Sequence, residues 1–239
     1  MPTALVLSAG GMYAAWEVGV WKALRHRFQP DLVVGASAGA WNGWAIAGGC
    51  PVEELIESWL DPSTADIMRP NWRRLGLMRP ETLHQRARQL FARYRPRIPF
   101  GLTLVEVPRL QSVLVRDAEV TWQLLTATCS IPILFPAVRI GGRRYVDGGL
   151  LGALPLWAAC EMGATRVVAV NALNTLPFRA LHRLLGQRRP APGPRISLIE
   201  PSAPLGSLRD AVRWSRANVE RWVEQGENDA NRMLTSITM

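Results

Sequence analysis

The sequence predicts an α/β protein of three layers (α/β/α), in which helices cover both faces of a mostly parallel sheet. Within the first fifty residues, a short apolar run, a glycine break and a helical segment follow one another twice. Such alternation builds a parallel sheet, because each helix carries the chain back to the start of the next strand. Ligands of such sheets bind where the carboxyl ends of strands meet the starts of helices. We therefore expect a functional site at the first two strand-to-helix turns.

The remaining elements follow from the spacing of apolar residues. Apolar runs predict strands at 3–8, 31–34, 102–107, 112–115, 166–170 and 195–199, and a hairpin at 137–146. Helical spacing predicts helices at 14–28, 38–47, 51–60, 81–94 and 155–162, and a long closing helix that begins at Ser207. Residues 121–129 fit a helix or a buried strand, and the sequence leaves both open.

We expect a single domain over residues 1–239. The chain has 239 residues, 48% of them hydrophobic, which is enough for one large core and short for two ordinary domains. Residues 62–100 differ from the rest, because they are rich in arginine and interrupted by Pro70, Pro80 and Pro96. We interpret this stretch as a variable insert and a candidate lid.

Positive charge is concentrated in two segments. The formal net charge is +9, and residues 69–97 hold nine arginines and one acid, Glu81, while residues 179–195 hold five arginines and no acid. Such patches suit an anionic membrane surface or a phosphate group, although an arginine bias equally reflects a genome's base composition. No recognised nucleic-acid-binding motif accompanies the arginines, so we do not expect nucleic acid as a partner.

The helix expected at 81–94 is basic and amphipathic. Its apolar residues line one face while its arginines lie elsewhere, which fits a helix resting on lipid or one packing against the core. The apolar positions are Leu83, Ala87, Leu90, Phe91 and Tyr94.

The sequence suggests a cytoplasmic protein, with peripheral contact at the inner membrane face as an option. No apolar run approaches the roughly 18 residues that a membrane span requires, and the apolar start lacks the features of an export signal. Cys50, Cys129 and Cys160 show no metal-ligand or Cys-x-x-Cys spacing, so we expect no metal and a reducing compartment. The oligomeric state is left open.

Residues 35–39 (GASAG) form a Gly-x-Ser-x-Gly element between a predicted strand and a predicted helix. The small residues Gly35 and Gly39 permit the sharp turn that lifts a serine hydroxyl above the sheet. Free amides at the start of the following helix favour developing negative charge. Ser37 is therefore a candidate nucleophile, although a glycine-rich turn with an incidental serine has the same pattern.

A serine hydroxyl needs a base to accept its proton, and the sequence offers two candidates. His182 follows an acid in the order of hydrolase triads, but it stands in a polar segment without a turn signature. Asp147 follows a predicted hairpin strand and precedes Gly148 and Gly149, which allow the backbone to approach closely. Because Asp-Gly is also an ordinary turn signal, these residues alone leave the base undecided.

Taken together, these elements resemble the patatin-like phospholipases. The similarity covers most of residues 4–49 and 125–171 and almost none of 62–100. By contrast, α/β-hydrolases place their nucleophile deep in the chain. The similar stretches are Leu7–Gly11, Gly19–Leu24, Val33–Ala40, Ile131-Pro132, Phe135-Pro136, Asp147–Gly149, Leu154-Pro155 and Gly163-Ala164.

The resemblance implies a patatin-like fold and a dyad of Ser37 and Asp147, 110 residues apart. It implies that the loop at Gly10, Gly11 and Met12 supplies backbone donors to the oxyanion. The reaction would be acylation of the serine and hydrolysis by water, with phospholipids, lysophospholipids or simple acyl esters as substrates and no cofactor. An aspartate serves as the base if a dry site raises its pKa above the ordinary ~3.9.

The loop at 9–14 departs from the common family pattern Gly-Gly-Gly-x-Arg-Gly. It reads AGGMYA, so the first and last glycines and the arginine are missing. Backbone donors tolerate side-chain changes, but losing one donor costs roughly 100- to 1,000-fold in rate. The alternative is therefore a catalytically weak or inactive family member that binds lipid or a partner.

Overall fold

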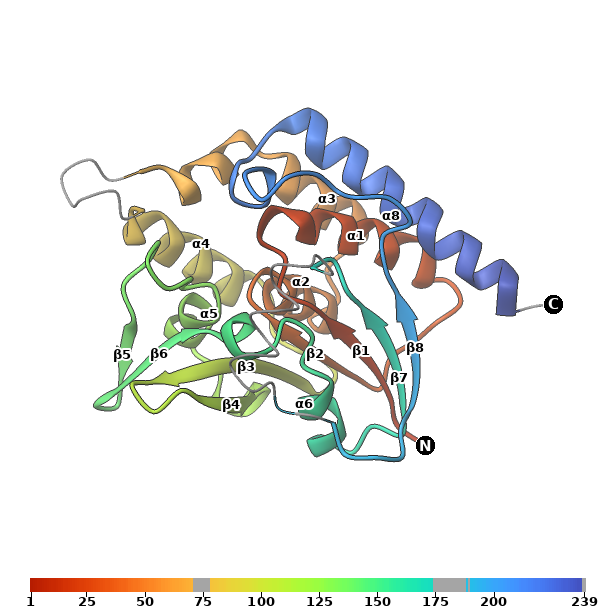
Figure 1. Ribbon diagram of the computed structural model, residues 1–239, viewed down its shortest axis with the longest axis horizontal. Helices are drawn as coiled ribbons and strands as arrows, with labels where there is room; N and C mark the ends of the chain where they lie inside the picture. Colours follow the sequence, from red (N-terminus) through yellow and green to blue (C-terminus); the bar gives the residue numbers. More distant parts are fainter. Residues whose placement is uncertain (71–77, 174–187, 189, 238–239) are drawn as a thin grey trace.

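The computed structural model describes residues 1–70, 78–173, 188 and 190–237, with side chains up to residue 234. In this part of the chain eight strands form one sheet in the order β5-β6-β3-β2-β1-β7-β8, and β4 pairs with β3 (Figure 1). Strands β3, β2, β1, β7 and β8 are parallel, whereas β4 and β6 run antiparallel to β3. The strands are β1 (Thr3–Leu7), β2 (Leu32–Ala36), β3 (Phe100–Val107), β4 (Gln111–Arg116), β5 (Val138–Ile140), β6 (Arg143–Asp147), β7 (Arg166–Val170) and β8 (Arg195–Ile199).

Helices pack on both faces of this sheet, which confirms the predicted α/β fold. The α-helices are α1 (Ala14–Leu24), α2 (Ala38–Ala47), α3 (Val52–Leu60), α4 (Pro80–Arg93), α5 (Trp122–Thr128), α6 (Leu156–Glu161) and α8 (Arg216–Ile237). Short 3-10 helices are η1 (Gly11–Tyr13), η2 (Pro62–Met68), η4 (Asp117–Glu119), η5 (Gly148–Leu151) and η6 (Asp210–Val212). None of the described helices is both long and apolar enough to cross a bilayer.

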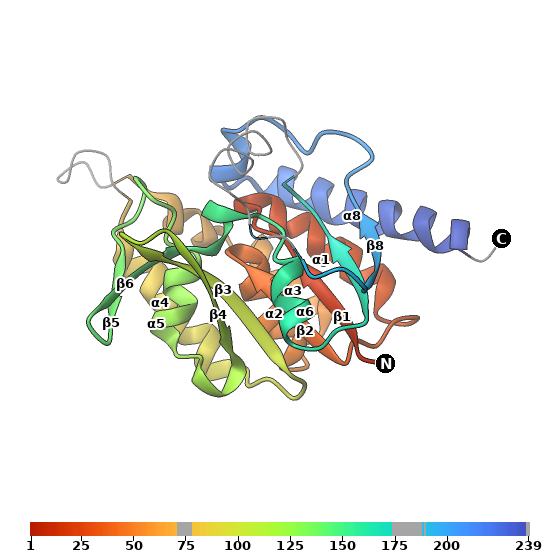
Figure 2. The ribbon, with the colours of Figure 1, turned by 60° about the horizontal axis from the view of Figure 1, so that its bottom comes forward.

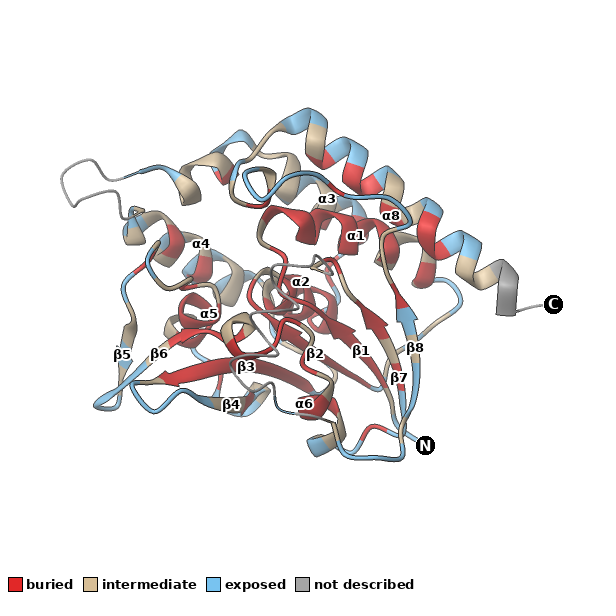
Figure 3. Ribbon diagram, viewed as in Figure 1, coloured by how far each residue is buried: buried red, intermediate tan, exposed pale blue. Residues whose placement is uncertain are grey.

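The alternation of side chains along β1 divides the core into two parts. Leu5 and Leu7 pack with the buried residues of α1, α2, α5 and α8, whereas Ala4 and Val6 pack with those of α6. Figure 2 shows α6 on the opposite face of the sheet from α1 and α2. Both faces of the central strands are therefore buried (Figure 3), as the continuous apolar runs of the sequence require.

Strands β2 and β6 lie end to end along one edge of β3. Strand β2 pairs with the first half of β3, up to Ala36 beside Thr103, and β6 pairs with the second half, from Leu104 beside Asp147. Strand β4 covers the other edge. Because β2 runs parallel to β3 and β6 runs antiparallel, their carboxyl ends meet. This register brings the residue after β2 next to the last residue of β6.

Helix α8 crosses α1 at two glycines. A Cβ on Gly19 would lie 2.0 Å from the carbonyl oxygen of Val223, and a Cβ on Gly226 would lie 2.0 Å from that of Trp16. The two backbones therefore approach too closely for any side chain at these positions. Nε1 of Trp16 also donates to Oδ2 of Asp229 at 2.9 Å. This crossing holds the closing helix against the helix that follows β1.

The closing helix begins at Arg216, so the prediction that it starts at Ser207 is wrong. The N–H and hydroxyl of Ser207 both donate to Oδ2 of Asp210, at 2.8 and 2.7 Å. These bonds hold a short turn at η6, so the helical spacing that begins at Ser207 does not continue as one helix. Leu208, the first apolar residue after Ser207, is exposed.

The segment 121–129 contains the helix α5 (Trp122–Thr128), which decides between the two structures that the sequence allowed. The apolar stripe of α4 also has a defined place. Leu83 and Ala87 are buried, and Leu90 lines a cavity described below. The apolar face of α4 therefore packs against the protein, while Arg86 and Arg93 also line the cavity and Arg88 is exposed.

Candidate active site

Ser37 occupies a sharp turn between β2 and α2. Its backbone has φ 54° and ψ −133°, in the region that side chains rarely adopt, and its carbonyl accepts from the Ala40 N–H at 2.9 Å. A Cβ on Gly35 would lie 2.5 Å from Cα of Ala40, and a Cβ on Gly39 would lie 2.2 Å from the carbonyl oxygen of Ser8. The turn therefore fits in this space only with glycine at both positions.

The hydroxyl of Ser37 donates to Oδ2 of Asp147 at 2.6 Å. The other carboxylate oxygen, Oδ1, accepts from the N–H of Gly149 at 2.7 Å, and Gly148 lies between them at the start of η5. Ser37 is 4% exposed and Asp147 is 5% exposed, so little water reaches the pair. Both carboxylate oxygens are thus fixed by donors, and one of those donors is the candidate nucleophile.

Burial raises the pKa of Asp147 to about 7, and the hydrogen bonds from Ser37 and Gly149 oppose that rise. At neutral pH the carboxyl group therefore exists in comparable amounts with and without its proton. A group with this pKa is suited to accept a proton and return it within one reaction cycle.

The loop at Gly10, Gly11 and Met12 lies beside this pair. Gly11 and Met12 line the same cavity as Ser37. Among the described residues, none accepts a hydrogen bond from the backbone N–H of Gly10, Gly11 or Met12. The loop therefore offers free amide donors next to the serine, as a site for a developing oxyanion requires.

A cavity of about 750 Å³ opens beside Ser37. It runs along the face of α2 that carries Trp41 and Ala45, and η2, α3 and α4 form its other walls. Two arginines in its lining are paired, Arg86 with Asp61 at 3.3 Å and Arg93 with Glu54 at 2.6 Å. Its volume and mainly apolar lining suit an elongated apolar group.

The comparisons with known proteins agree with this geometry. The family model of the patatin-like phospholipases matches residues 5–160. The chain belongs to the patatin-like phospholipase family. Membership of this family supports lipid acyl hydrolase activity and implies a lipid substrate.

Two solved structures are similar to this chain along 98% of its length. VipD from Legionella pneumophila has 13% sequence identity and a TM-score of 0.54, and the match covers 67% of its chain. The type III effector protein ExoU has 14% identity and a TM-score of 0.46, and the match covers 53% of its chain. At this identity the likeness to VipD shows the fold, which is the patatin fold.

Tyr13 stands where the common pattern of the patatin-like family has arginine. Its buried ring meets Trp222 edge-on, with 5.1 Å between ring centroids, and its hydroxyl donates to the Ser207 carbonyl oxygen. The segment around η6 therefore packs against the back of the loop, where Gly11 lies against Ala211. The altered side chain is turned into the core and does not occupy the cavity.

The described histidines do not reach this patatin-like site. His84 packs against Trp122, with 5.8 Å between ring centroids, and neither His84 nor His26 lines the cavity among the described residues. His182, the alternative base, lies outside the residues that the structure describes. Asp147 is the base candidate that the described residues bring to Ser37.

Glu17 is a site-adjacent residue that sequence reasoning missed. Its fully buried carboxylate accepts from the Ser8 hydroxyl at 3.0 Å and from Nδ2 of Asn42 at 3.2 Å. Oδ1 of Asn42 in turn accepts from Nε1 of Trp59 at 2.9 Å. This network joins the strand before the glycine loop to the helix after Ser37. In the sequence, the sign of this network is a single acidic residue, Glu17, in an otherwise apolar stretch of α1.

Cys129 also lies in the cavity wall near Ser37. Burial, followed by the nearby Asp147 carboxylate, raises the pKa of its thiol well above the ordinary value. The thiol therefore stays protonated at neutral pH and is not activated as a second nucleophile.

Proposed function

We propose that this protein hydrolyses lipid ester bonds through an acyl-enzyme, with Ser37 as nucleophile and Asp147 as general base. The observation that carries this proposal is the 2.6 Å hydrogen bond from the Ser37 hydroxyl to a buried carboxylate whose pKa is about 7. Asp147 accepts the hydroxyl proton as Oγ attacks the ester carbonyl carbon. The same proton then passes to the departing alcohol, and the acyl group remains on Ser37.

A water molecule then hydrolyses the acyl-enzyme. Asp147 takes a proton from a water molecule, which attacks the acyl carbonyl carbon, and the proton returns to Oγ of Ser37 as the fatty acid leaves. The N–H groups of Gly10, Gly11 and Met12 are the proposed donors to both tetrahedral oxyanions. Their support is that none of them has a hydrogen-bond acceptor among the described residues and that Gly11 and Met12 line the cavity. Gly35, Gly39, Gly148 and Gly149 shape the two turns that carry the dyad.

The cavity is the proposed site for the acyl chain. Ala45 lies eight residues beyond Ser37 on α2, so the apolar wall extends roughly 12 Å from the nucleophile. Trp41 and Trp59 contribute to this wall, while Trp16 and Trp44 are buried in the core. Substrates of this class include phospholipids, lysophospholipids and simple acyl esters. In this proposal α4, within the arginine-rich insert at 62–100, acts as the outer wall or lid, and the arginines hold an anionic membrane surface.

A second candidate function rests on the altered loop. A family member with weak or no turnover that binds lipid or a partner would retain the cavity, and the loop AGGMYA is the observation that favours it. Covalent labelling separates the two candidates, because a lipid-binding scaffold without an activated serine does not react with a fluorophosphonate.

The test is a panel of chromogenic acyl esters and phospholipids assayed with wild type, Ser37→Ala, Asp147→Asn and His182→Ala. We expect fluorophosphonate labelling and hydrolysis in wild type and in His182→Ala, and the loss of both in Ser37→Ala. Asp147→Asn should lose at least a hundredfold in rate, because general-base catalysis contributes typically 100- to 10,000-fold. Loss of activity in His182→Ala would assign the base to the histidine. Liposome binding without labelling in wild type would favour the second candidate.

A further inference from the structure

Ile133 is an unusual residue in the loop that joins α5 to β5. Its side chain is 87% exposed, and its backbone has φ 74°. A β-branched residue at positive φ is a genuine outlier, and such conformations persist only where the surrounding structure imposes them. The Phe135 N–H donates to the Ile131 carbonyl at 2.9 Å, which closes the turn around Ile133. The loop therefore holds a large apolar side chain in solvent, in a strained conformation.

This loop forms part of the cavity rim. Ile131 and Phe135, on either side of the exposed residue, both line the cavity beside Ser37. Phe135 is buried, so the turn points one apolar side chain inward and Ile133 outward. An acyl chain that enters the cavity past Ile131 and Phe135 therefore passes close to Ile133.

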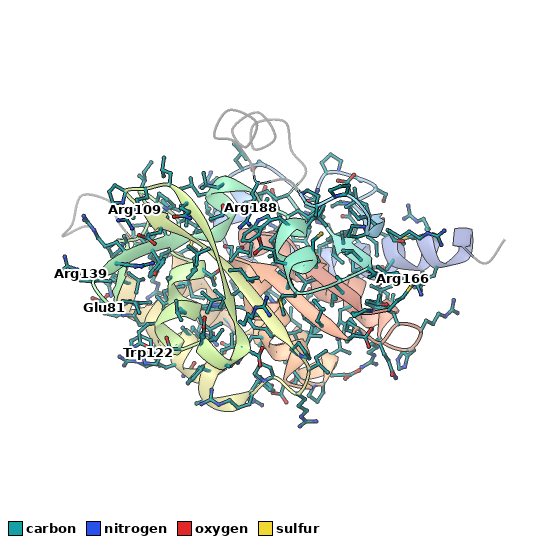
Figure 4. The ribbon with its side chains drawn as sticks, turned by 90° about the horizontal axis from the view of Figure 1, so that it is seen from below. Glu81, Arg109, Trp122, Arg139, Arg166 and Arg188 are labelled. Carbon is teal, nitrogen blue, oxygen red and sulfur yellow. The ribbon has the colours of Figure 1, made fainter. Side chains whose placement is uncertain are left out.

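Exposed arginines flank the same loop. The Met78 N–H donates to the Leu134 carbonyl at 2.8 Å, which places Arg79 next to it, and Arg139 follows on β5. Arg79 and Arg139 are exposed, and in the described part of the chain neither forms an ion pair. Figure 1 places the start of α4 and β5 along one margin of the molecule, and Figure 4 shows Arg139 and Glu81 at the same margin.

The hairpin that follows adds further positive charge to this margin. Arg144 is exposed and without an ion pair among the described residues, while Arg143 pairs with Glu106 at 3.3 Å. Arg69, whose carbonyl accepts from the Arg79 N–H at 3.3 Å, pairs with Asp66 at 2.9 Å. Among the described side chains around the loop, those without an ion-pair partner carry mainly positive charge. Such a surface is complementary to an anionic one.

We propose that the loop Ile131–Pro136 is an interfacial docking element, in which Ile133 inserts into an anionic lipid surface while Arg79 and Arg139 contact headgroup phosphates. An apolar anchor flanked by cations at a cavity rim matches the two parts of such a surface, the acyl boundary and the phosphate layer. The inference rests on the proposed function in one respect, since a lipid hydrolase gains from a cavity mouth that faces lipid.

Vesicle binding tests the anchor directly. Binding is measured in the Ser37→Ala background, so that vesicles are not consumed, with phosphatidylcholine vesicles that contain or lack about one third phosphatidylglycerol. Ile133→Asn removes the apolar group and introduces a residue that tolerates positive φ. We expect it to weaken binding to both vesicle types by about tenfold or more. The matched control is Leu198→Asn, since Leu198 is 47% exposed on β8 at the opposite end of the sheet, and it should leave binding unchanged.

The arginines are tested by a separate contrast. Arg79→Gln with Arg139→Gln should weaken binding to the anionic vesicles by about fivefold for each charge removed, and should hardly affect the neutral vesicles. With Ser37 restored, all variants should hydrolyse a soluble short-chain ester at the wild-type rate. This control separates the two proposals, because an inactive wild type contradicts the proposed function alone.

Two results would overturn the docking proposal. One is Ile133→Asn binding anionic vesicles as tightly as Leu198→Asn does. The other is a wild type that hydrolyses soluble esters but binds neither vesicle type, which would assign the exposed loop to a protein partner instead.

Discussion

The N–H of Ser37 donates to Oγ1 of Thr128 at 3.0 Å, and the same hydroxyl donates to the Thr103 carbonyl oxygen at 2.9 Å. Thr103 is the residue of β3 beside which β2 ends, and β6 ends beside its neighbour Leu104. The serine turn, α5 and the central strand are thus connected at the point where Asp147 arrives. The short contact between hydroxyl and carboxylate depends on the register of two strands and not on either turn alone.

The first prediction concerns the pH dependence of hydrolysis. A general base must be deprotonated in the free enzyme, and burial raises the pKa of Asp147 to about 7. We therefore expect kcat/KM for a soluble ester to be level above about pH 8 and to fall roughly tenfold per pH unit below about pH 6. An inflection near pH 4 would contradict a dry carboxylate at this position. An unchanged inflection in residual Asp147→Asn activity would point to another base.

The local parts of this site were open to prediction from the sequence. The pattern around Ser37 requires small neighbours and a following helix, and Asp147 precedes two glycines, so both turns are visible within a few residues. The alternation of apolar runs likewise predicted the parallel sheet. These signals are short-range, which is why the amino-acid sequence alone carries the resemblance to the family.

The rest depended on contacts between distant segments. Nothing near Asp147 specifies that β6 joins β3 where β2 stops, and periodicity does not reveal that Glu17 is enclosed by Ser8 and Asn42. The start of the closing helix was misplaced for the same reason. Helical spacing of apolar residues continues from Ser207 into α8, but contact between this segment and the loop at Tyr13 holds the chain out of the helix.

The second prediction concerns Glu17 and stability. Burial raises its pKa from an ordinary value of 4.5 to about 8, opposed by hydrogen bonds from Asn42 and Ser8. Between these pH values the native state holds a proton that the unfolded state releases, so the free energy of unfolding falls as pH rises through that window. At pH 8 the free energy of unfolding of Glu17→Gln should exceed that of wild type by on the order of a few kcal/mol, and its denaturant midpoint should be higher. Near pH 4.5 the two proteins should be equally stable.

Asp147 contributes a pH dependence of the same sign, because its pKa is also raised. Glu17→Gln should therefore retain a weaker slope between about pH 4 and 7, and adding Asp147→Asn should flatten it further. Denaturant unfolding at four pH values measures both effects. Equal slopes in wild type and in Glu17→Gln would mean that Glu17 remains ionised in the folded protein.

The third prediction concerns the depth of the cavity. Ala45→Leu places three additional carbons in the wall of α2, about two turns beyond Ser37. We expect hydrolysis of esters with twelve or more acyl carbons to fall about tenfold relative to esters with four, because only the longer chains reach this position. Leu55→Trp, from the facing helix α3, should have the same effect. A proportional loss for short and long esters would show that the variants disturb the dyad instead of the acyl site.

The fourth prediction concerns the crossing of α1 and α8, where Gly226 meets the Trp16 carbonyl at a distance that excludes a Cβ. In an isolated helix, alanine at this position would be favoured over glycine by about 1 kcal/mol. In this protein Gly226→Ala should instead lower the free energy of unfolding by about 1–3 kcal/mol or more, because the methyl group pushes the helices apart and overpacks a filled interface. Gly163→Ala is a useful comparison, since that glycine has φ 89° and open space around it, so its cost arises from backbone strain alone. Thermal unfolding of both variants checks the argument, and a Gly226→Ala protein as stable as wild type would show that α8 does not need this close approach to hold α1 and the loop that follows β1.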